Sequence, residues 1–319
     1  MTMAGAVPRR RIAPGEDVPV LALGSWNVWD RTTPKDAVAL LRRAAEVGAT
    51  FFDVGNYNLG PHAEGSRTDI LFGEYSRQAG LAREDYVLCG KLWLWDYPRT
   101  GFAAWMEESL ARIGVAAADC VVVGDHVDPV DIRRVVVDVN REIEAGRFRY
   151  WGVNNWPVSE AREAIAFAAA EGLIPPTFAQ LKYGLARRSM AEGRPYGELF
   201  DAGRLTLQAS DVFEGGILVG KTQPSRKIGA DVGGVREQII ASWPRVESAV
   251  RELGVTPAQL GIAFCLTHPA TANVLVGVSS VAQLEDGVGA LGLVGALGAA
   301  RLREAAAELW IDREVPPGG

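Results

Sequence analysis

The sequence predicts a (β/α)8 TIM barrel, an α/β fold formed as a single domain over residues 1–319. Short strand-like segments alternate with helical patterns eight times over the length of the chain, as a parallel barrel requires. Polar residues gather directly after several of these strands, where barrel enzymes carry their chemistry. No GxGxxG motif follows the first strand. A doubly wound open sheet is the alternative architecture.

Eight segments have the nearly continuous apolar character of strands that are buried on both faces. In chain order, the predicted strands are 19–26, 50–57, 86–93, 119–125, 149–156, 177–183, 205–210 and 273–280.

The segments between the strands place apolar residues at helical spacing. The first, 34–47, has Thr33 as its expected N-cap, Pro34 at the first helical position and Gly48 as its stop. A helix is also expected to open at Thr256-Pro257. The other predicted helices are 66–79, 101–113, 130–145, 158–171, 234–253 and 281–290.

The composition indicates which class of molecule the protein is expected to bind. The chain is 48% hydrophobic and 23% charged, which is typical of a globular protein. Its formal net charge is -6, and its basic residues are scattered instead of forming a stripe. Because nucleic-acid binding needs such a basic surface, we expect a small-molecule partner and no nucleic acid.

Cysteine usage and hydropathy predict a cytoplasmic protein without a metal site. Cys89, Cys120 and Cys265 all lie in apolar runs, where a thiol behaves as a small buried hydrophobe. The sequence has no CxxC pair, so zinc is not expected. It also has neither the apolar core of a secretion signal near its start nor a run long enough to span a membrane.

Polar and ionisable side chains follow four successive predicted strands. They are Asp53 and Tyr57, then Lys91, then Asp125 and His126, then Asn154 and Asn155. A lysine beside a tyrosine favours the phenolate and lowers the pKa of the phenol, while an aspartate keeps that lysine charged and oriented. Singly, each residue has an ordinary structural explanation, but together on one rim they predict a phenol that exchanges a proton with a carbonyl.

Several motifs resemble the aldo-keto reductases, NADP-dependent barrel enzymes with an Asp-Tyr-Lys-His tetrad. "LALGSW", "TFFDVGNY", "VLCGKLW" and "YWGVNNW" resemble the strands that carry the family's site. "GVTPAQLGIAFCLTHP" and "VLVGVSSVAQLEDGVGAL" resemble the family's closing helix and its cofactor-phosphate loop. The layout of 149–183 is similar to the branch that contains the potassium-channel β subunits. The resemblance covers nearly the whole chain.

By position, the resemblance implies that Asp53 and Lys91 support Tyr57 as proton donor to a substrate carbonyl, while NADPH gives hydride. It implies a catalytic histidine as well, for which His126 is the candidate. The residues implied to bind NADP are Gly24, Ser25, Trp26, Asn154, Asn155, Gln180, Ser210, Lys221, Arg226, Gly277, Ser279, Gln283 and Asp286. Among these, Asn154, Asn155 and Gln180 would hold the nicotinamide carboxamide. Ser279 and Gln283 would meet the 2′-phosphate and the adenosine.

The catalytic positions depart from the family pattern in two ways. Tyr57 lies one residue closer to Asp53 than is usual, so the phenol can be aimed differently. The family histidine falls on Gly124, and either His126 or Asp125 would have to turn into the pocket to replace it. His126 is equally well explained as a hydrogen-bonding residue of its loop.

The cofactor positions also depart from the family. Ala209 stands where an aromatic residue stacks on the nicotinamide, which leaves Phe213 as a substitute, and Asp211 replaces a proline. Asp286-Gly287 replaces a Glu-Asn pair that faces the adenosine.

Three functions are compatible with these residues. The first is NADPH-dependent reduction of an aldehyde or ketone in a pocket walled by Trp26, Trp29, Trp93, Trp95 and Trp156. The second is redox-silent proton chemistry, elimination or isomerisation, with weak or no NADPH binding; Gly124, Ala209 and Gly287 motivate it. The third is a cofactor-sensing regulatory subunit. The substrate, the choice between NADPH and NADH, and the oligomeric state stay open.

Overall fold

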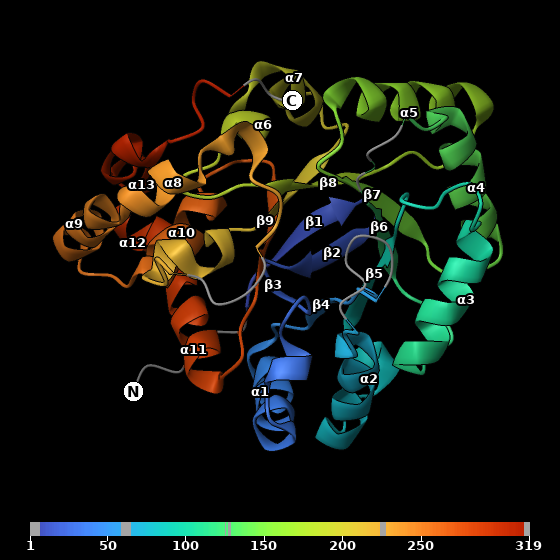
Figure 1. The fold of residues 1–319 in the computed structure, drawn as a ribbon, viewed down its shortest axis with the longest axis horizontal. Coiled ribbons are helices and arrows are strands. Elements are labelled where there is room, and N and C mark those ends of the chain that lie inside the picture. The colour runs from blue at the N-terminus through green and yellow to red at the C-terminus, as the bar shows by residue number, and fades with distance from the viewer. Residues whose placement is uncertain (1–6, 59–64, 125, 127–128, 224–227, 316–319) are drawn as a thin grey trace.

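A closed barrel of eight parallel strands forms the centre of the molecule (Figure 1). The structure is a computed structural model that describes residues 7–58, 65–124, 126, 129–223 and 228–315. Around the barrel the strands run in the order β10-β3-β4-β5-β6-β7-β8-β9. They are β3 Leu21–Gly24, β4 Phe51–Asp53, β5 Val87–Leu92, β6 Cys120–Val123, β7 Tyr150–Asn154, β8 Phe178–Lys182, β9 Thr206–Ser210 and β10 Thr271–Val276. The predicted (β/α)8 barrel is confirmed. Seven predicted segments each contain one of its strands, whereas 273–280 only overlaps β10, which begins earlier, at Thr271, and ends at Val276.

Helices surround the barrel and cover its outer face (Figure 1). The α-helices are α1 Pro34–Val47, α2 Thr68–Ala79, α3 Phe102–Ile113, α4 Ile132–Glu144, α5 Val158–Glu171, α6 Ser189–Glu192, α7 Arg194–Asp201, α8 Arg236–Ala241, α9 Trp243–Leu253, α10 Pro257–Leu266, α11 Val281–Gly289, α12 Leu293–Leu297 and α13 Ala299–Ala305. Short 3-10 turns are η1 Trp29–Arg31, η3 Arg83–Asp85, η4 Glu214–Val219, η5 Val232–Gly234, η6 Ala290–Gly292 and η7 Ala307–Leu309. The bounds of α1 are those predicted: the Thr33 hydroxyl accepts from Asp36 N, and Gly48 ends the helix with φ 80°.

The single helix predicted over 234–253 is wrong. The chain forms α8 and α9 there, separated at Ser242. Pro244 lies in the first turn of α9, where a missing N–H costs nothing because that turn has no helical acceptor. In one continuous helix the same proline would remove the bond to the carbonyl of Ile240 and its ring would clash there. The proline therefore restarts the helix.

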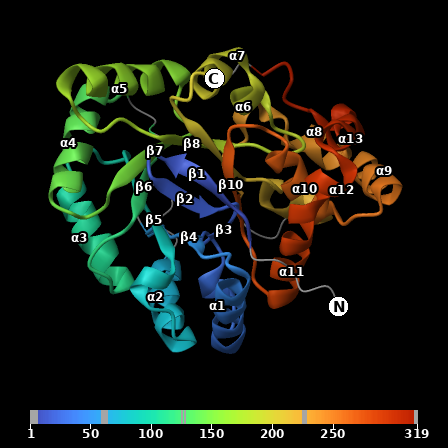
Figure 2. The same cartoon turned by 180° about the vertical axis from the view of Figure 1, so that it is seen from behind.

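An antiparallel hairpin lies across the N-terminal end of the barrel (Figure 2). It consists of β1 Arg9–Ala13 and β2 Glu16–Pro19 and was not predicted from the sequence. The Thr206 hydroxyl donates to the carbonyl of Ile12 over 3.1 Å. Ile12 also packs with Phe51 and Phe178 in the barrel interior. Because this end is covered, the accessible end is the opposite one, where the strands terminate.

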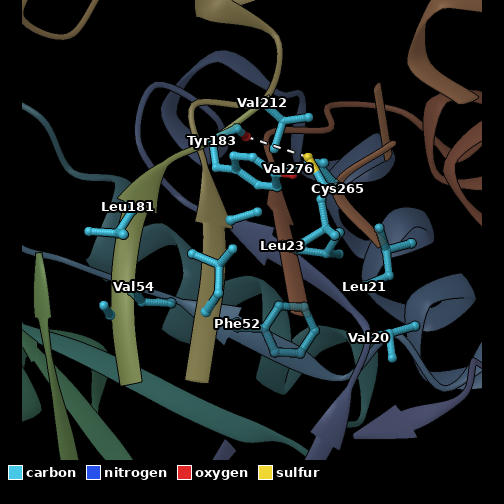
Figure 3. Packing of buried hydrophobic residues seen from close by; sticks show 14 of the residues in the cluster. Val20, Leu21, Leu23, Phe52, Val54, Leu181, Tyr183, Val212, Cys265 and Val276 are labelled. Atoms are coloured by element: carbon cyan, nitrogen blue, oxygen red, sulfur yellow. Dashed lines mark hydrogen bonds between the residues drawn. The ribbon is translucent and has the colours of Figure 1, made fainter. Parts of the chain in front are cut away.

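The larger apolar cluster lies between the barrel and its helices (Figure 3). Leu21, Leu23 and Val276 enter it from the strands, and Cys265 enters it from α10. The Cys265 thiol contacts the carbonyl oxygen of Tyr183 at 3.4 Å, and burial raises its pKa. All three cysteines are buried and unpaired, so they behave as core residues, as predicted.

Candidate active site

Backbone strain is concentrated at the C-terminal rim of the barrel. Within the described chain, four residues other than glycine have a left-handed φ: Asn27, Asn155, Asp211 and Glu214. Each follows the end of a barrel strand, β3, β7 or β9. Such conformations cost free energy and persist where the surrounding structure requires them, which is often at a functional site. The rim predicted to carry the chemistry is therefore also where the backbone is held in unusual conformations.

Asp53, Lys91 and Gln180 form one buried hydrogen-bonded group inside this rim. The Lys91 ammonium lies 3.1 Å from Asp53 Oδ2 and donates to Gln180 Oε1 over 2.8 Å. Gln180 Nε2 in turn donates to Asp53 Oδ2 over 2.8 Å. The Lys91 and Asp53 side chains are 5% and 2% exposed, so both charges are compensated almost entirely within the group. The structure thus brings together three residues from β4, β5 and β8.

Tyr57 lies beside this group with its ring buried. A Cβ added to Gly55 would lie 3.0 Å from Lys91 Cδ and 3.2 Å from Tyr57 Cζ, so both side chains approach the backbone there. The expected lowering of the Tyr57 pKa by Lys91 is wrong. Burial raises this pKa well above its ordinary value and the Asp53 charge adds to the rise, against a hydrogen bond with Ser25 that lowers it. The Lys91 ammonium is directed to Asp53 and Gln180, and the phenol is neutral.

An aromatic wall surrounds Tyr57. Trp26 stacks on its ring with centroids 6.1 Å apart, and Trp93 meets it edge-on at 5.7 Å. Trp93 stacks in turn on Trp95 at 4.2 Å. The other two tryptophans expected in the pocket belong to the packing: Trp29 lies against Phe72, and the buried Trp156 donates from Nε1 to Gly124 O. The wall therefore has three tryptophans.

A cavity of about 560 Å³ opens next to Trp26. Five of the residues predicted to bind a cofactor line it: Trp26, Lys221, Gly277, Ser279 and Gln283. Its other lining residues are Asn27, Val28, Arg31, Gly215, Gly220, Thr222, Gln223 and Val278. Gln283 belongs to the first turn of α11, where its backbone N–H donates to Ser280 Oγ and its side-chain oxygen accepts from Ser279 N. Two cations, Arg31 and Lys221, and a helix N-terminus thus face one space, an arrangement suited to phosphate groups.

Comparison with known proteins identifies the family of this barrel. A model of the aldo/keto reductase family matches residues 20–295. This chain belongs to the aldo/keto reductase family. A rice (Oryza sativa subsp. japonica) protein described as a probable voltage-gated potassium channel subunit beta is 27% identical over 300 residues, 88% of this chain and 89% of that protein. An Arabidopsis thaliana protein with the same description is 25% identical over 301 residues, with the same shares covered. Family membership indicates an oxidoreductase.

At the position of the family histidine, the aromatic wall takes the space. A Cβ added to Gly124 would lie only 2.6 Å from Trp93 Cε3, so the indole fills the volume that a side chain there would need. His126 lies elsewhere: its Nε2 is 2.8 Å from Glu160 Oε2 on α5, and its ring meets Trp156 edge-on. Asp125, the other candidate, lies outside the described residues. A catalytic role for His126 stays a prediction.

The residues predicted to hold the nicotinamide, Asn154, Asn155 and Gln180, lie at the end of β7 and within β8, and the predicted cofactor residues Gly24 and Ser25 lie at the end of β3. Asn155 is bound on both sides, since its Nδ2 donates to Asn154 Oδ1 and its Oδ1 accepts from Lys182 N. Gln180 belongs to the Asp53–Lys91 group. Ser25, which follows Gly24 of β3, is buried, and its backbone N donates to Asp53 O.

The remaining predicted cofactor residues either do not line the cavity or lie outside the residues that the structure describes. The Ser210 hydroxyl donates to Leu181 O. The Asp286 carboxylate accepts from the Thr256 hydroxyl, which joins α11 to the start of α10. Arg226 lies outside the described residues. Their cofactor roles stay predictions.

The replacements near β9 have partners of their own. The Asp211 carboxylate lies 3.3 Å from Lys182 Nζ, which also donates to Ala230 O. Phe213, the proposed substitute for the missing aromatic at Ala209, contacts the Gly261 position of α10 instead: a Cβ there would lie 3.1 Å from its ring. The acidic replacement is therefore neutralised by an ion pair, and the stacking role of Phe213 stays a prediction.

Two residues of the site, Arg31 and Gln208, were not predicted from the sequence. Arg31 follows the first barrel strand, so the rule that selected the other rim residues could have selected it as well. Gln208 is a polar residue inside an apolar strand, and its hydrogen-bond partner Gln180 lies on the neighbouring strand. Within the described residues no three or more His, Cys, Asp or Glu side chains group as metal ligands, and no helix is long and apolar enough to cross a membrane.

Proposed function

We propose that this chain reduces an aldehyde or ketone with NADPH and that Tyr57 donates the proton to the carbonyl oxygen. One observation carries the proposal: Trp26 lines the cavity of the predicted cofactor residues and also stacks on Tyr57. The candidate proton donor and the candidate cofactor site are therefore separated by a single side chain, which is the proximity that hydride and proton transfer to one carbonyl group need.

The residues of the cavity fit a phosphorylated dinucleotide. Arg31 and Lys221 would pair with phosphate oxygens, and the first turn of α11 would receive one at Ser279 and Gln283. Gly215, Gly220 and Gly277 let backbone approach a ligand closely. When bound, NADPH supplies a hydride equivalent. Asn154 and Asn155, at the end of β7, are the groups we assign to its carboxamide.

Tyr57 is suited to giving a proton. Because burial and Asp53 raise its pKa, the phenol stays protonated at neutral pH and can donate to an oxygen that gains negative charge. The buried Lys91 ammonium, held by Asp53 and Gln180, keeps a cation next to the phenolate that this donation creates. Trp26 and Trp93, which both pack against the ring, would exclude water from the transfer.

The test is a fluorescence titration with NADPH followed by turnover of a panel of aldehydes and ketones. Tyr57→Phe should keep NADPH affinity and lose nearly all turnover. Tyr86→Phe is the matched control, since Tyr86 is as buried as Tyr57, at 6% exposure, but packs against Phe52 and Phe72 away from the site. Undetectable NADPH binding up to millimolar concentration would contradict the proposal.

A second candidate is proton chemistry without redox change, elimination or isomerisation of a carbonyl compound. It is favoured by the neutral Tyr57 together with Gly124 and Ala209, which remove a histidine and an aromatic from the family pattern. The same panel separates the two, because substrate would then be consumed without oxidation of NADPH. The names of the rice and Arabidopsis relatives suggest a third role, as a regulatory subunit, for which recovery of a bound partner is the test. A cytoplasmic location stays a prediction.

A further inference from the structure

Four amide side chains stand at one level of the barrel interior. Asn154, Gln180, Gln208 and Asn273 lie on the consecutive strands β7, β8, β9 and β10, and the pairing register sets each beside the next. Paired residues on neighbouring strands point to the same face. Since Gln180 points inward to Asp53 and Lys91, the amides of this layer point inward as well. Gln208 and Asn273 are fully buried.

The chemistry of its neighbours fixes the orientation of the Gln180 amide. An ammonium can only donate and a carboxylate can only accept, so Oε1 must face Lys91 and Nε2 must face Asp53. The second N–H of Nε2 donates to Gln208 Oε1 over 2.5 Å. Gln208 is oriented in turn, because a flip would set two amide nitrogens against each other. Its own Nε2 has no partner within the described residues.

We propose that Gln208 is a positioning residue that acts through Gln180: it accepts the remaining N–H of the Gln180 amide and so holds that amide firmly in the orientation that Lys91 and Asp53 require beside Tyr57. Loss of the Gln208 oxygen leaves one Gln180 N–H without an acceptor in a buried site, which weakens the hold on the amide. The Lys91 ammonium would then be held less firmly by its second anchor. This consequence for turnover rests on the proposed function, whereas the effect on Lys91 does not.

The layer also limits what Gln180 can offer a cofactor. Both of its N–H groups are engaged, by Asp53 and Gln208, and one lone pair of Oε1 is engaged by Lys91. Only the second lone pair of Oε1 is left, so Gln180 can accept one hydrogen bond from a carboxamide and donate none. Its main role is therefore internal to the Asp53–Lys91 group.

The test follows the Lys91 ammonium directly by NMR in protein containing lysine labelled with heavy nitrogen. The chain has five lysines, Lys35, Lys91, Lys182, Lys221 and Lys227, so the side-chain signals are few, and Lys91→Arg assigns the relevant one. In Gln208→Met, a substitution of similar shape without the amide oxygen, the Lys91 signal should shift and its hydrogen exchange should accelerate about tenfold. Asn273→Leu is the matched control, because Asn273 lies in the same layer and neither of its polar side-chain atoms has a partner within the described residues.

An unchanged Lys91 signal in folded Gln208→Met would overturn the proposal, and so would an equal change in Asn273→Leu, which would show general loosening of the barrel. If Gln208→Met does not fold, the wild type decides: ammonium exchange at Lys91 as fast as at the exposed Lys35 would refute the anchoring. If the wild-type protein turns over a carbonyl substrate, Gln208→Met should lower kcat and leave NADPH affinity unchanged. Absence of turnover in every form, with the Lys91 response intact, would refute the proposed function alone.

Discussion

Adding one methyl group at Gly124 should disturb the aromatic wall beside Tyr57. A Cβ there would lie 2.6 Å from Trp93 Cε3 and 3.0 Å from Cζ3. Carbon atoms in contact are normally about 3.5–4.0 Å apart, so the indole must retreat by roughly 1 Å. It is held between Tyr57 and Trp95, and its Nε1 donates to Asn56 O over 2.9 Å. Overpacking of this kind costs about 1–3 kcal/mol, and loss of the hydrogen bond adds about 1 kcal/mol.

Urea unfolding of Gly124→Ala measures this cost as a loss of about 2–4 kcal/mol in the free energy of unfolding. The matched control is Gly197→Ala in α7, where a Cβ meets no atom within 4 Å and a helical alanine should stabilise by about 0.5–1 kcal/mol. Trp93→Leu removes the clashing ring, so the double variant Gly124→Ala/Trp93→Leu should lose less than the sum of the two single losses. Wild-type stability in Gly124→Ala, or strict additivity in the double variant, would refute the assigned packing.

Two further predictions concern the cavity and Tyr57. Arg31→Ala and Lys221→Ala should each raise the Kd for NADPH about tenfold and weaken its dependence on salt, whereas Arg134→Ala on α4 should leave the Kd unchanged. Fluorescence titration measures the Kd. An unchanged Kd in both Arg31→Ala and Lys221→Ala would show that these cations are not part of the site. The raised pKa of Tyr57 also predicts alkaline instability: above pH of about 10 the unfolded chain loses this proton while the folded chain keeps it, so the free energy of unfolding falls as pH rises. Unfolding at several pH values should show a shallower fall in Tyr57→Phe than in Tyr86→Phe, and equal slopes would contradict the assignment.

The fold could be predicted because the barrel strands and α1 each have a clear signal in their local sequence. The strands are apolar on both faces, and α1 has its cap, its proline and its terminal glycine in sequence. The N-terminal hairpin lacks such a signal, since β1 begins with three exposed arginines and buries only Ile12 and Ala13. Its burial depends on the barrel end that it covers, a long-range contact that hydropathy cannot show.

In the candidate site, too, some features could be predicted from local sequence and others could not. Asp53, Tyr57 and Lys91 could be proposed from their places after strands, because parallel strands in a barrel end on one rim. Their electrostatics could not. The Tyr57 pKa depends on how deeply the ring is buried and on which partner the Lys91 ammonium faces, and both are set by packing around Gly55 and by Gln180 on a distant strand.

Two departures from the family pattern are accommodated by a second residue. Gly124 takes the place of a histidine, and the Trp93 indole fills the space that it leaves. Asp211 takes the place of a proline, and Lys182 lies 3.3 Å from its carboxylate. An uncompensated change would leave a void or an unpaired charge at the rim, and each would cost stability. Since neither is left at these two positions, both replacements fit the rim around Tyr57 without a void or an unpaired charge.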